Sequence, residues 1–228
     1  TIEPNTGRVA VPDKRLDELA QIAQSAKIIY SQLEFVDIAG LVRDASKGEG
    51  LGNQFLGHIR EVDAIAHVLR CFEDENITHV EGNIDPIRDL EIIETELLLA
   101  DIESLEKQRV SLEKKVRGNE KEAKSKLSLI EKIYPKMSNG IAARKIDSLS
   151  IEESSLIFSM GLITVKPMLY VCNLSEDHII EGNAFSKAVS EKAKSENCGY
   201  TFVSAQIEQE LSLLDDTEST EYLLSTGE

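Results

Sequence analysis

LEFVDIAGLVRDASKGEGLGN, residues 33–53, is the stretch that decides the fold. It begins as the apolar run of a β-strand and then reaches an acid and a glycine, Asp37 and Gly40. Three alternating glycines at 48, 50 and 52 follow. In an open α/β sheet, ligands bind beyond the carboxyl ends of strands. A carboxylate can hold Mg²⁺, and a glycine amide can approach a phosphate because it has no Cβ. The stretch therefore predicts a nucleotide-phosphate loop.

Composition limits the classes of function. The 228 residues include 41 acids and 25 bases, giving a net charge of −16. This balance opposes sequence-independent attraction of the whole surface to nucleic acid, although a local basic patch remains compatible with it. The three cysteines lack Cys-x-x-Cys spacing, which indicates reduced core residues. Because the sequence has no membrane-length apolar run and no signal peptide, we expect a cytoplasmic protein without membrane or sequence-specific DNA partners.

Strand and helix patterns alternate along most of the chain. The apolar runs predict strands, and the stripes spaced by three or four residues predict helices. The expected strands are residues 8–11, 28–30, 33–36, 64–72, 168–172 and 200–203, and the expected helices are 13–23, 54–61, 184–195 and one starting at 207. Residues 64–72 are nearly continuously apolar, as in a central parallel strand. The order predicts a three-layer α/β fold with a parallel sheet.

A different pattern begins at Asp85-Pro86. Apolar residues recur at alternating steps of three and four up to Val116, pause at Gly118-Asn119, and recur again up to Met137. Two such seams joined by a short turn predict an antiparallel helical hairpin. The alternative is that the seams pack on the main domain. The expected organisation is a nucleotide-binding domain in two parts, residues 1–84 and 141–228, with a helical arm at 85–140 between them.

Three loops follow predicted strands. The first is Asp37 to Gly40, the second is Asn173-Leu174-Ser175-Glu176, and the third is Ser204-Ala205. Their order matches the motif series of P-loop nucleotide hydrolases, in which a phosphate sensor precedes a base-recognition loop and a supporting Ser-Ala loop.

Six specific motifs extend this match: TIEPNTG at 1–7, FVDIAGLV at 35–42, SKGEGLGNQFL at 46–56, RCFEDENITHVEG at 70–82, DPIRDLEIIETEL at 85–97 and NLSE at 173–176. In these motifs the chain resembles the YchF/Obg-like ATPase family of translation-factor-related P-loop GTPases. The resemblance implies a G-domain interrupted by a helical arm. It also implies that Thr1, matching the family's switch threonine, meets Mg²⁺ and the terminal phosphate. Asp37 and Gly40 then match the metal-side acid and the phosphate-sensing glycine. The alternative for Thr1 is a solvated terminal residue.

The base loop departs from ordinary GTPases. Their Asn-Lys-x-Asp uses the acid to accept two guanine N–H groups, but here Leu174 replaces the lysine and Glu176 the aspartate. The resemblance implies that ATP is preferred or at least accepted, with Asn173 and the Leu174 backbone lining the base site, and Ser204 and Ala205 supporting it. Alternatively, Asn173 only braces the loops.

Catalysis needs a residue that orients water. Many GTPases have glutamine after Asp-x-x-Gly, where this chain has Leu41. The resemblance points to His79, because histidine can orient or deprotonate water near neutral pH. A surface or packing role for His79 is the alternative. His58 and His67 are expected to be structural, and His178 to flank the nucleotide at most.

No Gly-x-x-x-x-Gly-Lys-Ser/Thr motif occurs in these residues. Because a P-loop holds the β- and γ-phosphates, we expect the 228-residue chain to be a fragment that is inactive alone. It lacks the P-loop and the ubiquitin-like module that the resemblance places after residue 228. For the intact parent, we expect a Mg²⁺-dependent ATPase, using GTP as well, that acts as a switch with ribosome or translation partners. The alternative is a non-enzymatic module that binds a protein through the arm. RNA binding by the arm's lysines and arginines is a third hypothesis, weighed against a solvated helix face.

Overall fold

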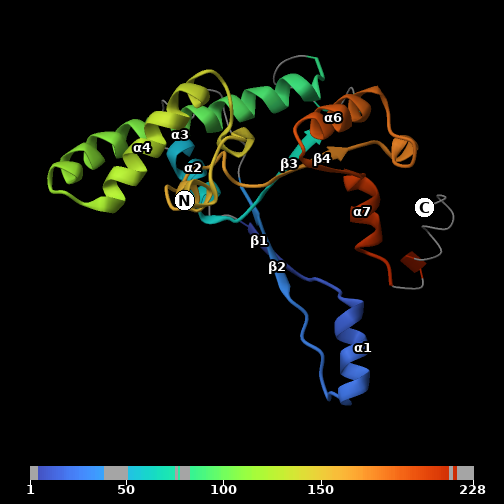
Figure 1. Cartoon of the computed structure of the whole chain (residues 1–228). Coiled ribbons are helices and arrows are strands. Elements are labelled where there is room, and N and C mark those ends of the chain that lie inside the picture. Colours follow the sequence, from blue (N-terminus) through green and yellow to red (C-terminus); the bar gives the residue numbers. More distant parts are fainter. Residues whose placement is uncertain (1–4, 39–50, 75–76, 78–82, 216–217, 220–228) are drawn as a thin grey trace. The chain divides into compact units, whose positions relative to one another are not determined.

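Figure 1 shows the computed structural model of the chain, which describes residues 5–38, 51–74, 77, 83–215 and 218–219. For residues 51–54 it describes the backbone alone. Contacts within the chain divide it into two compact units, Thr1–Leu41 and Val42–Glu228. Each unit is described by itself.

The first unit is a two-stranded sheet with one helix. Strands β1 (Asn5–Ala10) and β2 (Gln32–Asp37) pair antiparallel, and α1 (Lys14–Ala23) lies between them in sequence. The helix begins as predicted, because the Asp13 carboxylate accepts the Arg15 amide at 3.0 Å. The predicted strand at 28–30 is wrong: this segment has no strand pairing, and the Tyr30 hydroxyl donates to the Asp17 carboxylate instead.

The second unit contains a parallel sheet of three strands. The helix α2 (Leu51–Glu61) leads into β3 (Ile65–Arg70), and the strands β4 (Met168–Asn173) and β5 (Gly199–Val203) complete the order β3-β4-β5. The parallel pairing confirms the predicted α/β class. The central place in this sheet belongs to β4, however, whereas β3 was expected there. On β3 Val68 is 63% exposed, because its side chain lies on the face opposite that of the buried Leu69.

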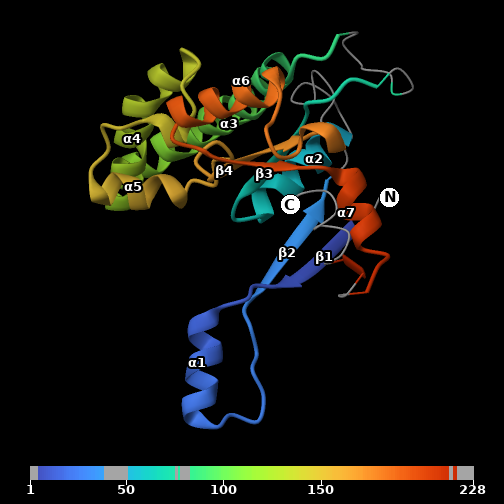
Figure 2. The same cartoon turned by 90° about the vertical axis from the view of Figure 1, so that its right-hand side faces the viewer.

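Helices cover one face of this sheet. Figure 2 shows α3 (Pro86–Arg117) and α6 (Ala184–Ser195) on the same side of β3 and β4. Alternate residues of β4 (Met168, Tyr170 and Cys172) are buried, as the period of two along a strand requires. Cys71 and Cys172 are buried free thiols, as predicted.

The helical hairpin predicted from the seams is present. Asp85 caps α3, Pro86 occupies its first turn, and α4 (Lys121–Ser138) returns beside it. The buried residues of the two helices in their shared core include Leu98, Leu105, Leu112, Ala123, Leu129, Ile130, Ile133 and Met137. The helices η1 (Ala143–Lys145) and α5 (Ile151–Phe158) follow. None of the helices in the described part of the chain has the length and apolarity needed to cross a membrane.

A buried carboxylate joins the hairpin to the strand that carries the base loop. Asp101 of α3 has no exposed surface and accepts the amides of Ile163 and Thr164 at 2.7 and 2.8 Å. It also accepts the Thr164 hydroxyl at 2.7 Å. Two residues further on, the Lys166 ammonium donates to the carbonyls of Ile59 and Arg60 in the last turn of α2 and to that of Val62 just after it. The segment before β4 therefore holds the hairpin and α2 together.

Candidate nucleotide site

Two of the three predicted loops meet at the carboxyl end of the parallel sheet. Asn173 is the last residue of β4, and Ser204-Ala205 comes directly after β5, the neighbouring strand. The Asn173 side-chain oxygen accepts the Ala205 amide at 3.0 Å. The Leu174 amide donates to the Val203 carbonyl at 2.8 Å. The base loop and the Ser-Ala loop are thus fixed to each other by two hydrogen bonds.

The Asn173 hydrogen bond realises the bracing role that the sequence left open. It uses the side-chain oxygen only. Because an asparagine amide has two donors besides its oxygen, the nitrogen end keeps its capacity to donate to a base. Bracing and ligand binding are therefore compatible at this residue.

Leu174 and Glu176 have opposite environments. The Leu174 side chain is only 2% exposed, so a ligand at this position can meet little beyond its backbone. Glu176 is exposed and begins the short helix η2 (Glu176–His178). Within that turn the Ser175 hydroxyl and His178 Nδ1 lie 3.0 Å apart. The loop thus combines the exposed carboxylate of Glu176 with the buried side chain of Leu174.

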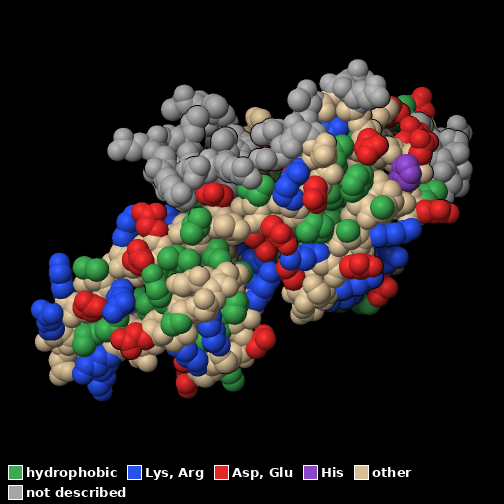
Figure 3. Space-filling view, turned by 90° about the horizontal axis from the view of Figure 1, so that it is seen from above, with side chains coloured by type: hydrophobic (Ala, Val, Ile, Leu, Met, Phe, Trp, Pro, Cys, Tyr) green, Lys and Arg blue, Asp and Glu red, His purple; other side chains and the backbone are tan. Residues whose placement is uncertain are grey.

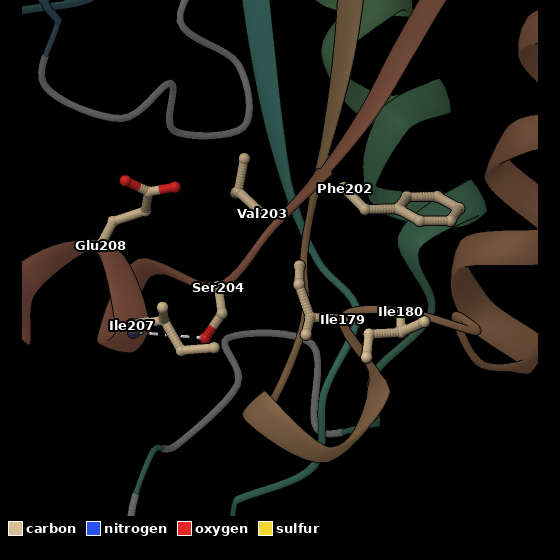
Figure 4. Close-up of a pocket in the computed structure, with 7 residues that line it drawn as sticks. All are labelled: Ile179, Ile180, Phe202, Val203, Ser204, Ile207 and Glu208. Atoms are coloured by element: carbon tan, nitrogen blue, oxygen red, sulfur yellow. Dashed lines mark hydrogen bonds between the residues drawn. The ribbon is translucent and has the colours of Figure 1, made fainter. Parts of the chain in front are cut away.

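A pocket lies beside these loops (Figure 4). Its volume is about 390 Å³, within the range of small-molecule sites. The residues that line it are Ile179, Ile180, Phe202, Val203, Ser204, Ile207 and Glu208. In Figure 4, the residues of α7 (Ala205–Leu211) lie on one side of Val203 and Ser204, and the isoleucines that follow η2 lie on the other. The walls are mainly apolar, with one carboxylate and one hydroxyl.

Sequence reasoning found only Ser204 among these lining residues. The indication that could have led to the others is position, since Ile179-Ile180 follows the base loop and Ile207-Glu208 follows Ser204-Ala205. The Ser204 hydroxyl caps α7 by accepting the Ile207 amide at 3.5 Å. Its first role is therefore to start α7.

A tight turn brings the η2 segment against β5. Gly182 has φ +69°, a conformation that side-chain-bearing residues rarely adopt. A Cβ at this position would lie 2.7 Å from the Ser186 hydroxyl and 3.3 Å from the Phe202 ring. A side chain at position 182 would therefore disturb the turn that supports the pocket wall.

The loop after β3 is anchored by a residue that sequence reasoning missed. The Arg70 guanidinium donates to the carbonyls of Phe72, Asp74 and Ile77 at 3.1, 3.2 and 2.9 Å. Asn183, the cap of α6, donates to the Cys71 carbonyl at 2.6 Å. These bonds hold the loop at residues 71, 72, 74 and 77. His79, the predicted water-orienting residue, lies outside the described residues.

The phosphate and metal side of the predicted site is described only at Asp37. This residue ends β2 in the first unit and is exposed. Thr1 and Gly40 lie outside the described residues. In the described part of the chain, no cluster of three or more His, Cys, Asp or Glu side chains has metal-site geometry. A lone carboxylate fits Mg²⁺ nevertheless, because proteins hold this ion through one or two carboxylates together with substrate phosphates and water.

His67 behaves as a structural residue. Burial lowers its pKa from 6.5 to about 4, which keeps the ring neutral at pH 7. Its ring meets Tyr170 edge-on, with the ring centroids 6.3 Å apart. These surroundings agree with the packing role expected from its place in a strand.

Comparison with known proteins finds relatives that match the whole chain. Residues 1–100 match the family model described as 50S ribosome-binding GTPase. The whole chain is 49% identical to the ribosome-binding ATPase YchF of Haemophilus influenzae and 46% identical to that of Escherichia coli O157:H7. The chain resembles the YchF proteins along its whole length. It is also similar to the YchF GTPase structure from Schizosaccharomyces pombe, with a TM-score of 0.81 and 36% identity over the whole chain.

The chain spans 62% of the length of each of these YchF relatives and of the solved structure. The likeness to a YchF structure supports the mixed α/β fold with a parallel sheet and an inserted helical arm.

Proposed function

We propose that the protein containing this chain is a Mg²⁺-dependent nucleoside triphosphatase that prefers ATP, also accepts GTP, and acts as a cytoplasmic switch on the ribosome. The observation that carries the nucleotide part is the hydrogen bond between Asn173 and Ala205, which joins the base loop to the Ser-Ala loop. The ribosome part is supported by the names of the relatives and of the matching family model. The division into residues 1–84, 85–140 and 141–228 belongs to the same proposal.

Within this proposal the residues have separate tasks. Asn173 Nδ2 donates to the base, the Leu174 backbone and Ala205 border it, and Ser204 holds the start of α7. Glu176 disfavours guanine, because its carboxylate is carried on a longer side chain than the aspartate of Asn-Lys-x-Asp. Asp37 holds Mg²⁺ through water together with Thr1, and Gly40 meets the γ-phosphate. His79 orients the attacking water.

Mg²⁺ would supply charge neutralisation on the phosphates. One carboxylate at Asp37 is compatible with that task. The 228 residues contain no P-loop motif, and removing even one preorganised donor costs about 3 kcal/mol in a transition state. We therefore propose that these 228 residues alone do not turn over ATP. ATP hydrolysis by the purified chain above the rate of an Asp37→Ala control would contradict this.

Base preference can be measured on the chain itself, because NMR detects millimolar binding. We expect ADP to shift the backbone amide signals of Asn173, Glu176 and Ala205 at lower concentrations than GDP does. The double variant Leu174→Lys, Glu176→Asp restores the guanine pattern and should reverse the order. Asp177→Asn, an exposed neighbour outside the motif, is the matched control. Equal or stronger GDP shifts in the unaltered chain would overturn the ATP preference.

The alternative is a non-enzymatic module that binds a protein through the arm. A chain without residues 85–139 separates the two functions. ADP shifts that survive the deletion favour the nucleotide switch, whereas protein capture that is independent of nucleotide and lost with the arm favours the module.

A further inference from the structure

Positive charge is concentrated at the end of the helical hairpin. We define the arm tip as residues 114–126, which comprise the last turn of α3, the connection and the start of α4. It contains six basic residues and two acids, a net charge of +4. Because the whole chain carries −16, the remainder carries −20. In Figure 3 the hairpin extends to the left, and Lys and Arg side chains crowd its end.

Most of these cations have no acidic partner. Lys126 pairs with Glu122 at 2.8 Å, and Lys124 donates to the Asn119 side chain at 3.0 Å. Within the described part of the chain, no carboxylate lies within 4.0 Å of the other four. These free cations, all exposed, are Lys114, Lys115, Arg117 and Lys121. On residues 103–113 the charges neutralise each other, because Lys107 and Arg109 are paired with glutamates of the same helix. The tip does not have this arrangement.

The helix dipole explains the position of only three of the six basic residues of the tip. Lys114, Lys115 and Arg117 lie in the last turn of α3, where cations interact favourably with the helix dipole. Lys121 and Lys124 lie at the beginning of α4, where the same dipole disfavours them. The cap residue of α4, Glu120, makes no side-chain capping bond. The helix dipole therefore does not explain why Lys121 and Lys124 stand at the start of α4.

The chemistry of the tip selects among polyanions. Its only apolar side chains are Val116 and Ala123, and both pack in the seam between the helices. Protein interfaces depend on buried aromatic and large apolar anchors, which the tip does not expose. It also has no aromatic residue on which a base could stack. What it presents is a compact set of free cations, which suits a phosphate backbone rather than base edges.

We propose that the arm tip binds the phosphate backbone of RNA without reading its sequence. The assignment of that RNA to the ribosome rests on the proposed function, whereas the binding chemistry does not. The strong negative charge of the remaining chain confines this attraction to the tip, so the hairpin would approach the RNA end-on.

The test uses the intact 228-residue chain and a fluorescent 16-base-pair RNA duplex, titrated at several salt concentrations. The variant Lys114→Gln, Lys115→Gln, Arg117→Gln, Lys121→Gln removes the four free cations. The matched control removes four exposed lysines elsewhere: Lys14→Gln, Lys27→Gln, Lys187→Gln and Lys194→Gln. Both variants have the same net charge. Each phosphate contact contributes about −0.9 to the slope of log K against log salt.

We expect the tip variant to lose roughly 100-fold in affinity at about 50 mM salt and to flatten the slope by about 3 to 4. The control should keep at least the steepness of the unaltered chain. Equal affinity of the tip variant and the control would overturn the proposal, as would failure of the unaltered chain to bind. If polyglutamate displaces the duplex as effectively as unlabelled RNA does, the proposal is wrong and the partner is an acidic protein.

Co-sedimentation with ribosomes separates this proposal from the proposed function. Ribosome binding that the tip variant retains would refute the arm tip as the contact while leaving the ribosome as partner. If the tip variant loses both duplex binding and ribosome binding while the control variant keeps them, this proposal and the proposed function are both supported. RNA binding without any ribosome binding by the unaltered chain would refute only the ribosomal source.

Discussion

At the scale of single residues, Asn173 connects the fold to the candidate site. Its side-chain oxygen accepts the Ala205 amide, and its backbone ends the central strand. Asn173→Ala leaves that amide without a partner, so we expect the free energy of unfolding to fall by about 1–2 kcal/mol. Asn173→Asp keeps an oxygen acceptor and should stay within about 0.5 kcal/mol of the unaltered chain in the same urea titration. Equal losses in the two variants would show that the hydrogen bond is not the cause.

His67 gives the chain a pH dependence whose sign can be worked out. Its folded pKa of about 4 lies below its ordinary 6.5, so the unfolded chain binds the proton more readily. This contribution to stability is complete above pH 6.5 and is lost as pH falls towards 4, by at most about 3 kcal/mol. His67→Phe should flatten the urea-derived stability between pH 4.5 and 6.5. His178→Gln, at an exposed histidine, should leave the slope unchanged, and a slope that persists in His67→Phe would assign it to other groups.

At the scale of elements, the carboxyl end of α2 is capped by a side chain that is distant in the sequence. The Lys166 ammonium donates to the carbonyls of Ile59 and Arg60 at 2.7 Å each, and to that of Val62. A cation here satisfies carbonyls that the helix leaves without partners and opposes the helix dipole.

Lys166→Met keeps the aliphatic length and removes the three donors. We expect a loss of about 1–3 kcal/mol, with faster amide exchange concentrated at the end of α2. Lys187→Met, at an exposed lysine of α6, is the control. Exchange that rises evenly through the sheet instead would mean that Lys166 acts on global stability rather than on α2.

Elements with a strong local pattern could be predicted from the sequence. The α3–α4 hairpin follows from two apolar seams and the Asp85-Pro86 start, and α1 follows from its Asp13 cap. Residues 28–30 were misjudged because their apolar run has no strand partner, and Tyr30 bonds to Asp17 instead. The edge place of β3 depends on which strands pair, and periodicity within one strand carries no such information.

The candidate site divides in the same way. Asn173 and Ser204-Ala205 could be found because each loop follows an apolar strand in a recognisable order. Arg70 and Asn183 could not, because their hydrogen bonds go to main-chain carbonyls of other segments, where any residue type would serve as acceptor. The placement of Thr1, Gly40 and His79 stays a prediction.

At the scale of the whole second unit, one buried carboxylate connects the hairpin to the sheet. Burial raises the pKa of Asp101, and three hydrogen bonds from Ile163 and Thr164 oppose that rise. The Thr164 hydroxyl oxygen also accepts a hydrogen bond from the Ala143 amide at 3.1 Å, so the network extends to the segment that follows the hairpin. The network ends at Pro167, whose carbonyl accepts the Ile65 amide at the start of β3.

Asp101→Asn therefore tests whether hairpin and sheet form one cooperative structure. The amide directs a donor at groups that are themselves donors, so we expect a loss of about 2–4 kcal/mol. If the network couples the two parts, amide exchange should accelerate at residues 162–168 and in the base of α3 together, while unfolding stays a single transition. Asp147→Asn, an exposed acid beside the hairpin, should change neither. Two separate urea transitions in Asp101→Asn, with the hairpin unfolding first, would show instead that this carboxylate alone holds the hairpin to the sheet.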